Sequence, residues 1–358
     1  MLKKQILHTL LIFSCIHLFT GNSFAVVFQN PTDKNFSYLF VPGIFSIETQ
    51  TAKYIPEFIS SSGEKLICNG GIHTLNEPIS TCTFSEISVQ PLNNQSMNPL
   101  VHLGCLITGK FNKKYGVSVQ RSQQPTPTDA SQPQATLISD HTVEQHAFDF
   151  TKLNLAQEAD INALFKTYTD HIEKYPATDI VLYGVSRGAS TICTFMGKHQ
   201  PQNVKALVLE SPFDSIPHFL KHSQKTSYIS GIANKLLPKV TAYNPNGESP
   251  ITSIANISKD IPILLVGSYF DDVVPLQCSQ SLARKFSKLG HHKVHLLVLN
   301  KSSHSGYAFD DYADKIKYET VVHAFYKHYG LPYDDTLASQ GADEWKKISG
   351  QSALMPSK

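Results

Sequence analysis

The feature that most constrains the fold is a regular alternation of short apolar runs with helical segments in the second half of the chain. The apolar runs are nearly continuous, and they are IVLYG (180–184), VKALVLES (204–211), PILLVGS (262–268) and KVHLLVLN (293–300). Segments with helical patterning lie between them, as in ASTICTFMGKHQ (189–200) and QSLARKFSKLG (280–290). Strands that alternate with helices and are apolar throughout are typical of a parallel sheet covered on both faces. The sequence therefore predicts an α/β fold with a mostly parallel central sheet.

Further elements extend this predicted domain over residues 26–332. They are a buried strand at FSYLFV (36–41) that stops at Pro42-Gly43, a helix divided near Pro56 within 49–60, a strand ending in 147–150, an amphipathic helix from Leu155 to Ile172 and a last helix near Tyr318–Tyr329. Each follows from apolar spacing or from turn residues.

Three segments depart from the alternation. Residues 69–140 form a large insertion after the first helix, in which short alternating runs predict small strands or hairpins. Within it, residues 121–138 are rich in Gln, Pro, Ser and Thr and predict a surface loop. Residues 212–256 predict a small cap of loops and helices, and residues 333–358 predict a weakly structured C-terminal tail. The insertion is open to three interpretations: a lid, a module for substrate recognition or an elaborated surface loop.

The first 25 residues have the organisation of a secretory signal peptide. Lys3 and Lys4 precede an apolar stretch from Ile6 to Phe19, and small residues stand at the cleavage positions up to Ala25. The stretch is short for a membrane span. A retained anchor and a lipoprotein signal ending at Cys15 are the alternatives. We predict cleavage after Ala25, export to the periplasm or the cell exterior, and no stable membrane insertion afterwards.

The charge balance argues against nucleic acid as a partner. The chain has 31 basic and 29 acidic residues, and the excess of two equals Lys3 and Lys4 of the predicted signal peptide. A mature chain without net charge has no electrostatic reason to bind nucleic acid or an anionic membrane.

The cysteines are compatible with an exported protein but show no metal-binding spacing. Cys68, Cys82 and Cys105 share one region, and a disulfide between two of them is plausible after export. For Cys193 and Cys278 we favour buried free thiols.

The histidines likewise give little sign of a metal site. His291, His292 and His295 cluster near a helix-to-strand turn, but adjacent surface histidines are usually solvated. His218 and His222 lie in the predicted cap, where they are candidates for substrate contact. We predict neither a metal nor another cofactor.

The segment DIVLYGVSRGAS (179–190) contains the strongest functional motif. Its GVSRG stretch places Ser186 between two glycines, directly behind a predicted strand and before a predicted helix. A serine on such a sharp strand-to-helix turn is typical of a nucleophile. The pattern also arises by chance, so the hypothesis requires a carboxylate and then a histidine after later strands.

Both residues are present in that order. Asp271 and Asp272 follow the PILLVGS strand, and His304 follows the KVHLLVLN strand. The carboxyl ends of parallel strands open onto the same edge of a sheet, so these side chains should meet Ser186 there. His304 would take the serine proton, and the aspartate would hold the imidazole in the correct tautomer.

On these motifs the chain resembles the α/β-hydrolase superfamily, with its esterases, lipases and serine aminopeptidases. The resemblance covers roughly residues 143–330 and rests on GVSRG, LESPFDS, SPITSIANISKDIPILLVGSYFDDVVP and SSHSG. It implies that the acid is Asp271, the first position of D-x-x-V-P. Asp272 is the alternative acid, and Glu210 or Asp214 after an earlier strand are ranked lower.

The resemblance also implies an oxyanion hole made of backbone amides. One donor is the N–H of Arg187, after the nucleophile. The other is expected after the first strand, where this chain has Pro42-Gly43 in place of the His-Gly sequence common in the superfamily. Ile44 is the candidate there and Phe45 the next. The Arg187 side chain would form a structural ion pair or bind a substrate carboxylate, and we favour the ion pair.

The predicted function is a secreted or periplasmic serine hydrolase that cleaves a carboxylic ester through an acyl-enzyme. Its partner would be a small-molecule or lipid-like acyl substrate. A peptidase or amidase of the same superfamily is the second hypothesis, because one triad serves both chemistries. A non-catalytic binding protein on a hydrolase scaffold is the third.

Overall fold

The computed structural model describes ten stretches of the chain. They are residues 26–29, 36–41, 43, 68–69, 82–91, 114–123, 142–147, 153–224, 226–304 and 311–351. The predicted signal peptide and the helix predicted at 49–60 lie outside these residues. Along the part of the chain that the structure describes, no helix combines the length and the apolar character that a membrane span requires.

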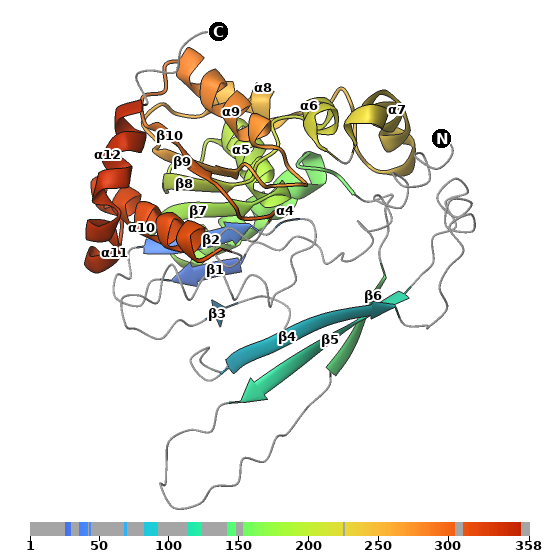
Figure 1. Cartoon of the computed structure of the whole chain (residues 1–358), viewed down its shortest axis with the longest axis horizontal. Coiled ribbons are helices and arrows are strands. Elements are labelled where there is room, and N and C mark those ends of the chain that lie inside the picture. The colour runs from blue at the N-terminus through green and yellow to red at the C-terminus, as the bar shows by residue number, and fades with distance from the viewer. Residues whose placement is uncertain are drawn as a thin grey trace, which may run out of the picture.

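The core is a seven-stranded sheet in the order β10-β9-β8-β7-β2-β1-β3 (Figure 1). Its strands are β1 (Val26–Gln29), β2 (Phe36–Val41), β3 (Cys68–Asn69), β7 (Asp179–Val185), β8 (Val204–Glu210), β9 (Ile263–Ser268) and β10 (Val294–Leu299). The five strands from β10 to β2 pair in parallel, and β1 pairs antiparallel with both of its neighbours. The predicted mostly parallel α/β sheet is confirmed, and a short strand precedes β2.

Helices cover both faces of this sheet. They are α4 (Glu158–Lys174), α5 (Arg187–His199), α6 (Ile216–His222), α7 (Ser230–Val240), α8 (Pro250–Ser253), α9 (Leu276–Lys288), α10 (Tyr312–His328), α11 (Asp335–Gln340) and α12 (Ala342–Gln351). Successive strand residues point to opposite faces. Thus Ile180 and Leu182 of β7 pack with α4, α5 and α9, while Val181 and Tyr183 pack with α10 and α12.

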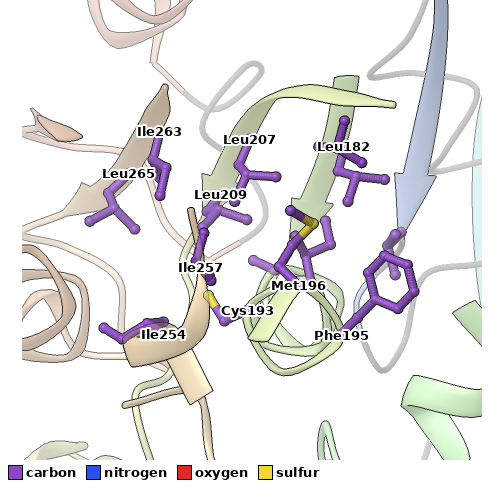
Figure 2. Close-up of a cluster of buried hydrophobic side chains, with 14 of the residues drawn as sticks. Leu182, Cys193, Phe195, Met196, Leu207, Leu209, Ile254, Ile257, Ile263 and Leu265 are labelled. Carbon is purple, nitrogen blue, oxygen red and sulfur yellow. The ribbon is translucent and has the colours of Figure 1, made fainter. Parts of the chain in front are cut away.

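Figure 2 shows the first of these two layers. Cys193, Phe195 and Met196 of α5 lie beneath Leu182, Leu207 and Leu209 of the sheet. Burial of one large aliphatic or aromatic side chain contributes about 1.5–3 kcal/mol to folding. Helix α5 is thereby fixed against β7, and the turn between them is held at the edge of the sheet.

The described part of the C-terminal tail, residues 333–351, is folded, which corrects the prediction of a weakly structured tail there; residues 352–358 lie outside the described residues. Helix α11 begins after Asp334, whose carboxylate accepts the Leu337 N–H at 2.9 Å. Trp345 and Ile348 of α12 are buried in the same cluster as α10. The tail was predicted as weakly structured because its few apolar residues are widely spaced among polar ones. Helical spacing nevertheless brings them to one face.

Of the strand end predicted at 147–150 the structure describes Ala147, which does not lie in the parallel sheet. Instead β6 (Thr142–Ala147) pairs antiparallel with β5 (Lys114–Gln123), which pairs antiparallel with β4 (Cys82–Pro91) in a second, three-stranded sheet (Figure 1). The β6 sequence TVEQHA is polar at most positions, unlike the continuous apolar runs of the parallel strands. Residues 148–150 are outside the described residues. The predicted strands of the insertion agree with β4 and β5, although β5 extends into the predicted loop.

The segment predicted as a cap contains α6, α7, α8 and two short 3-10 helices, η4 (Ser227–Ile229) and η5 (Ile254–Asn256). Helices α6 and α7 form a third buried cluster, which includes Leu220 and Leu237. In contrast, α8 and η5 pack on α5, and Ile254 belongs to the main core. The end of this segment is therefore part of the central layers.

Candidate active site

Ser186 lies on the sharp turn between β7 and α5. Its backbone is at φ 55° and ψ −119°, a strained conformation for a residue other than glycine. The turn is held because the Ser186 N–H donates to the Glu210 carbonyl at 2.7 Å. A Cβ at Gly184 would lie 2.7 Å from the Ala189 nitrogen, so only glycine allows this close approach of strand and helix. The geometry is that of a nucleophile elbow.

His304 joins Ser186 to Asp271. Its Nε2 lies 3.0 Å from Ser186 Oγ, and its Nδ1 lies 2.9 Å from Asp271 Oδ2 and 3.0 Å from Oδ1. A carboxylate can only accept, so Nδ1 carries a proton and donates it to Asp271. Nε2 of the neutral ring is then free to accept the Ser186 hydroxyl proton. The structure brings together the three residues that the sequence singled out, each just beyond the end of a parallel strand.

The Asp271 carboxylate is buried and held by several donors. Ser211 Oγ donates to Oδ2 at 2.7 Å, and the N–H groups of Val273 and Val274 donate to Oδ1 at 3.0 and 2.8 Å. These bonds fix the carboxylate against His304. Ser211 was not among the predicted site residues, although it directly follows β8 at the same sheet edge, and that position was the available signal.

The other candidate acids occupy different places. Asp272 is partly exposed and acts on His304 through its charge. The Glu210 carboxylate accepts from the Tyr318 hydroxyl at 2.9 Å, and the Asp214 carboxylate lies 2.7 Å from His218 Nδ1. The position of Asp271 against His304 therefore supports the first-ranked acid.

The surroundings of His304 raise its pKa above the ordinary value of 6.5. Burial by itself lowers the pKa, but the charge of Asp271 and its hydrogen bond raise it more. The charges of Glu210 and Asp272 act in the same direction. The protonated imidazolium that forms during acyl transfer is consequently stabilised.

The predicted oxyanion donors are only partly described. Arg187 is the first residue of α5, where the free N–H groups and the helix dipole favour a negative charge. Its buried guanidinium lies 3.8 Å from Asp160 Oδ1, which agrees with the favoured ion pair. Ile44 and Phe45 lie outside the described residues. Val41 at the end of β2 pairs with Gly184, so the end of β2 lies beside the elbow.

Two expectations about other side chains have clear outcomes. Cys193 and Cys278 are buried free thiols as expected, and burial raises the pKa of Cys193 to about 12. His291 and His295 are buried, so the prediction of solvated histidines is wrong for them. His291 packs edge-on against Phe286, and His295 Nε2 lies 2.7 Å from the Tyr329 hydroxyl. The Tyr329 partner of His295 lies 34 residues further along the chain, which is why the burial of His295 could not be predicted.

Comparison with known families agrees with this fold and site. Residues 156–330, which carry the nucleophile, the acid and the base, match the sequence model of the prolyl oligopeptidase family. The chain has the α/β-hydrolase fold. The described site of this α/β-hydrolase is that of a serine hydrolase, with Ser186, His304 and Asp271 in hydrogen-bonded order. Among proteins with curated descriptions, none has a significant sequence match to the chain.

Solved structures with similarity to this α/β-hydrolase are distant in sequence. The acylaminoacyl peptidase of Pyrococcus horikoshii has 16% identity and a TM-score of 0.40, over 52% of this chain and 30% of the peptidase. A puromycin-hydrolyzing peptidase of Mycobacterium tuberculosis has 14% identity and a TM-score of 0.35, over 48% of this chain and 25% of its own. An esterase of Pyrococcus furiosus has 16% identity and a TM-score of 0.34, over 48% of this chain and 62% of the esterase. The α/β-hydrolase thus spans less than a third of the length of these two peptidases.

Proposed function

We propose that this protein is a hydrolase that cleaves an acyl bond through a covalent acyl-enzyme on Ser186. The observation that carries the proposal is the 3.0 Å contact of His304 Nε2 with Ser186 Oγ, while Nδ1 is held by Asp271. A serine hydroxyl is a weak nucleophile at neutral pH and needs a base at this distance.

The reaction follows from these contacts. Ser186 Oγ attacks the carbonyl carbon of the substrate and transfers its proton to His304 Nε2. The Arg187 N–H, together with an amide from the segment after β2, stabilises the oxyanion. The leaving group takes the proton from His304. Water then gives a proton to His304 and attacks the acyl-enzyme. When the bond to Ser186 Oγ breaks, His304 returns this proton to Oγ and the carboxylic acid is released.

The bond that is cleaved has two candidates. A carboxylic ester is the default substrate of such a triad, whereas the match to the prolyl oligopeptidase family favours a peptide or amide bond. Two substrates that share one N-acyl aminoacyl group, one a methyl ester and the other a p-nitroanilide, separate them. Anilide turnover supports a peptidase, and ester turnover without anilide turnover supports an esterase.

Labelling by a fluorophosphonate probe tests the proposal itself. The wild-type protein is expected to form a covalent adduct on Ser186, because His304 activates this hydroxyl. The adduct is expected to be absent in Ser186→Ala and retained in Ser287→Ala, a control at an exposed serine of α9. Intact-protein mass spectrometry measures both. An unlabelled wild type, or an adduct that persists in Ser186→Ala, would favour a non-catalytic binding protein.

The rate of probe labelling is expected to fall in acid, with a midpoint above pH 6.5. His304 must be neutral to accept the Ser186 proton, and its pKa is raised, so the active form is lost as the pH falls through that higher pKa. The second-order labelling rate, measured between pH 5 and pH 9, gives the midpoint. A midpoint at or below 6.5 would contradict the stabilisation of the imidazolium by Asp271.

We further propose that the protein is exported. The support is the basic start and apolar stretch of residues 1–25, which lie outside the described residues. The division of the chain into an insertion at residues 69–140 and a cap at residues 212–256 is likewise a proposal from the sequence. We also propose that the substrate is a small-molecule or lipid-like acyl compound and that nucleic acid is not a partner.

A further inference from the structure

Three side chains with metal-binding atoms converge beside the active site. Asp214 follows β8, His218 lies on α6 and Cys278 lies on α9. One donor atom from each lies within 4.8 Å of the other two. Asp214 Oδ2 is 2.7 Å from His218 Nδ1, and Cys278 Sγ is 4.0 Å from the same nitrogen. None of the three takes part in the proposed acyl transfer.

We propose that Asp214, His218 and Cys278 bind a zinc ion. Carboxylate, imidazole and thiolate are the ligands that Zn²⁺ takes in proteins, at about 2.0–2.3 Å in tetrahedral geometry. Such bond lengths place the ligand atoms roughly 3.3–3.6 Å from one another. His218 Nδ1 lies 2.7 Å from Asp214 Oδ2, below this range, and 4.0 Å from Cys278 Sγ, above it. Shifts of about 0.6 Å would bring both distances into the range that zinc ligands require.

The charge of the three ligands suits a buried divalent cation. Asp214 and Cys278 are both buried, and a buried charge is tolerated when it is paired or coordinates a metal. A carboxylate and a thiolate together neutralise Zn²⁺, and the neutral imidazole adds no charge. The His218 side chain is 28% exposed, which leaves an entry route for the ion and room for water as the fourth ligand.

Ion binding has a defined proton balance. Burial and the Asp214 charge raise the pKa of the Cys278 thiol, so it is protonated before the ion binds. Coordination of Zn²⁺ releases this proton to solvent and forms the Zn–S bond. The His218 proton moves from Nδ1 to Nε2, so that Nδ1 can bind the ion.

The ion would act as a structural clamp. It would tie α6 to the first turn of α9, and α9 follows directly from the loop in which Asp271 accepts the Val273 and Val274 N–H groups. The site is separate from the triad, where Asp271 faces His304. A role in stability is therefore expected whether or not the protein hydrolyses acyl bonds.

Cobalt substitution tests the site directly. The untagged full chain is stripped with a chelator and titrated with Co²⁺. A thiolate-to-cobalt charge-transfer absorption is expected that saturates at a single ion per chain and is displaced by Zn²⁺. At a free Zn²⁺ concentration 100-fold above Kd, the Tm is expected to rise by about 5 °C.

Three variants locate the site. Cys278→Ala and His218→Gln are expected to lose the absorption and the Tm shift, whereas Cys193→Ala, the other described buried thiol, keeps both. His218 is partly exposed, so His218→Gln decides the question if Cys278→Ala does not fold. Absence of both signals in the wild type overturns the proposal. So does their persistence in either His218→Gln or folded Cys278→Ala, because another group would then bind the ion.

Discussion

Asp271→Asn is expected to lower kcat/KM by about 10⁴-fold while the protein stays folded. The Asp271 carboxylate accepts the Nδ1 proton of His304 at 2.9 Å, which leaves Nε2 facing Ser186 Oγ. An asparagine that turns its NH₂ group toward the ring would instead favour the tautomer with the proton on Nε2. That tautomer cannot accept the serine proton, and the positive charge on His304 during the reaction would lose its buried counter-charge.

The neighbouring residue provides a matched control. Asp272→Asn removes one negative charge at the same loop, but Asp272 is partly exposed and acts on His304 through solvent-screened charge. Its kcat/KM is expected to stay within about threefold of wild type. Steady-state kinetics on the better of the two acyl substrates, with circular dichroism as a check of folding, measures both variants. A larger loss in Asp272→Asn would assign the acid to Asp272, and an equal loss in both would contradict the assignment to Asp271.

The order and position of the triad could be predicted because they depend on the pattern of strands. Each of the strands β7, β9 and β10 is a short apolar run, and Ser186, Asp271 and His304 follow the ends of these strands by one, three and five residues. In a parallel sheet such positions share one edge, so no knowledge of side-chain packing was required. The same argument identified Glu210 and Asp214 as candidate acids after β8, but it did not predict the hydrogen bond from Ser211 to Asp271.

Features that depend on packing between distant segments could not be predicted in this way. Trp345 and Ile348 are isolated apolar residues in a polar tail, and packing against α10 and β10 makes their burial favourable. Asp214, His218 and Cys278 have no metal-binding spacing, since α9 contributes its cysteine 60 residues after the histidine. The sequence therefore predicted no metal, whereas the fold brings the three side chains into one cluster.

Gly197→Ala is expected to destabilise the protein by about 2–3 kcal/mol, against the preference of helices for alanine. Gly197 is buried in α5, and a Cβ there would lie 2.1 Å from the Ser253 carbonyl oxygen of α8. The Ser253 carbonyl is backbone and cannot move aside as the end of a flexible side chain could. Helices α5 and α8 would therefore have to separate, which would weaken the packing of α5 behind the Ser186 turn. Gly231→Ala in α7 is the control, because its Cβ would meet nothing within 4 Å and alanine should be neutral or stabilising by up to about 1 kcal/mol. Urea unfolding measures both. If Gly197→Ala proved as stable as Gly231→Ala, α8 would not pack on α5, and residues 250–256 would belong with the mobile part of a cap rather than with the core.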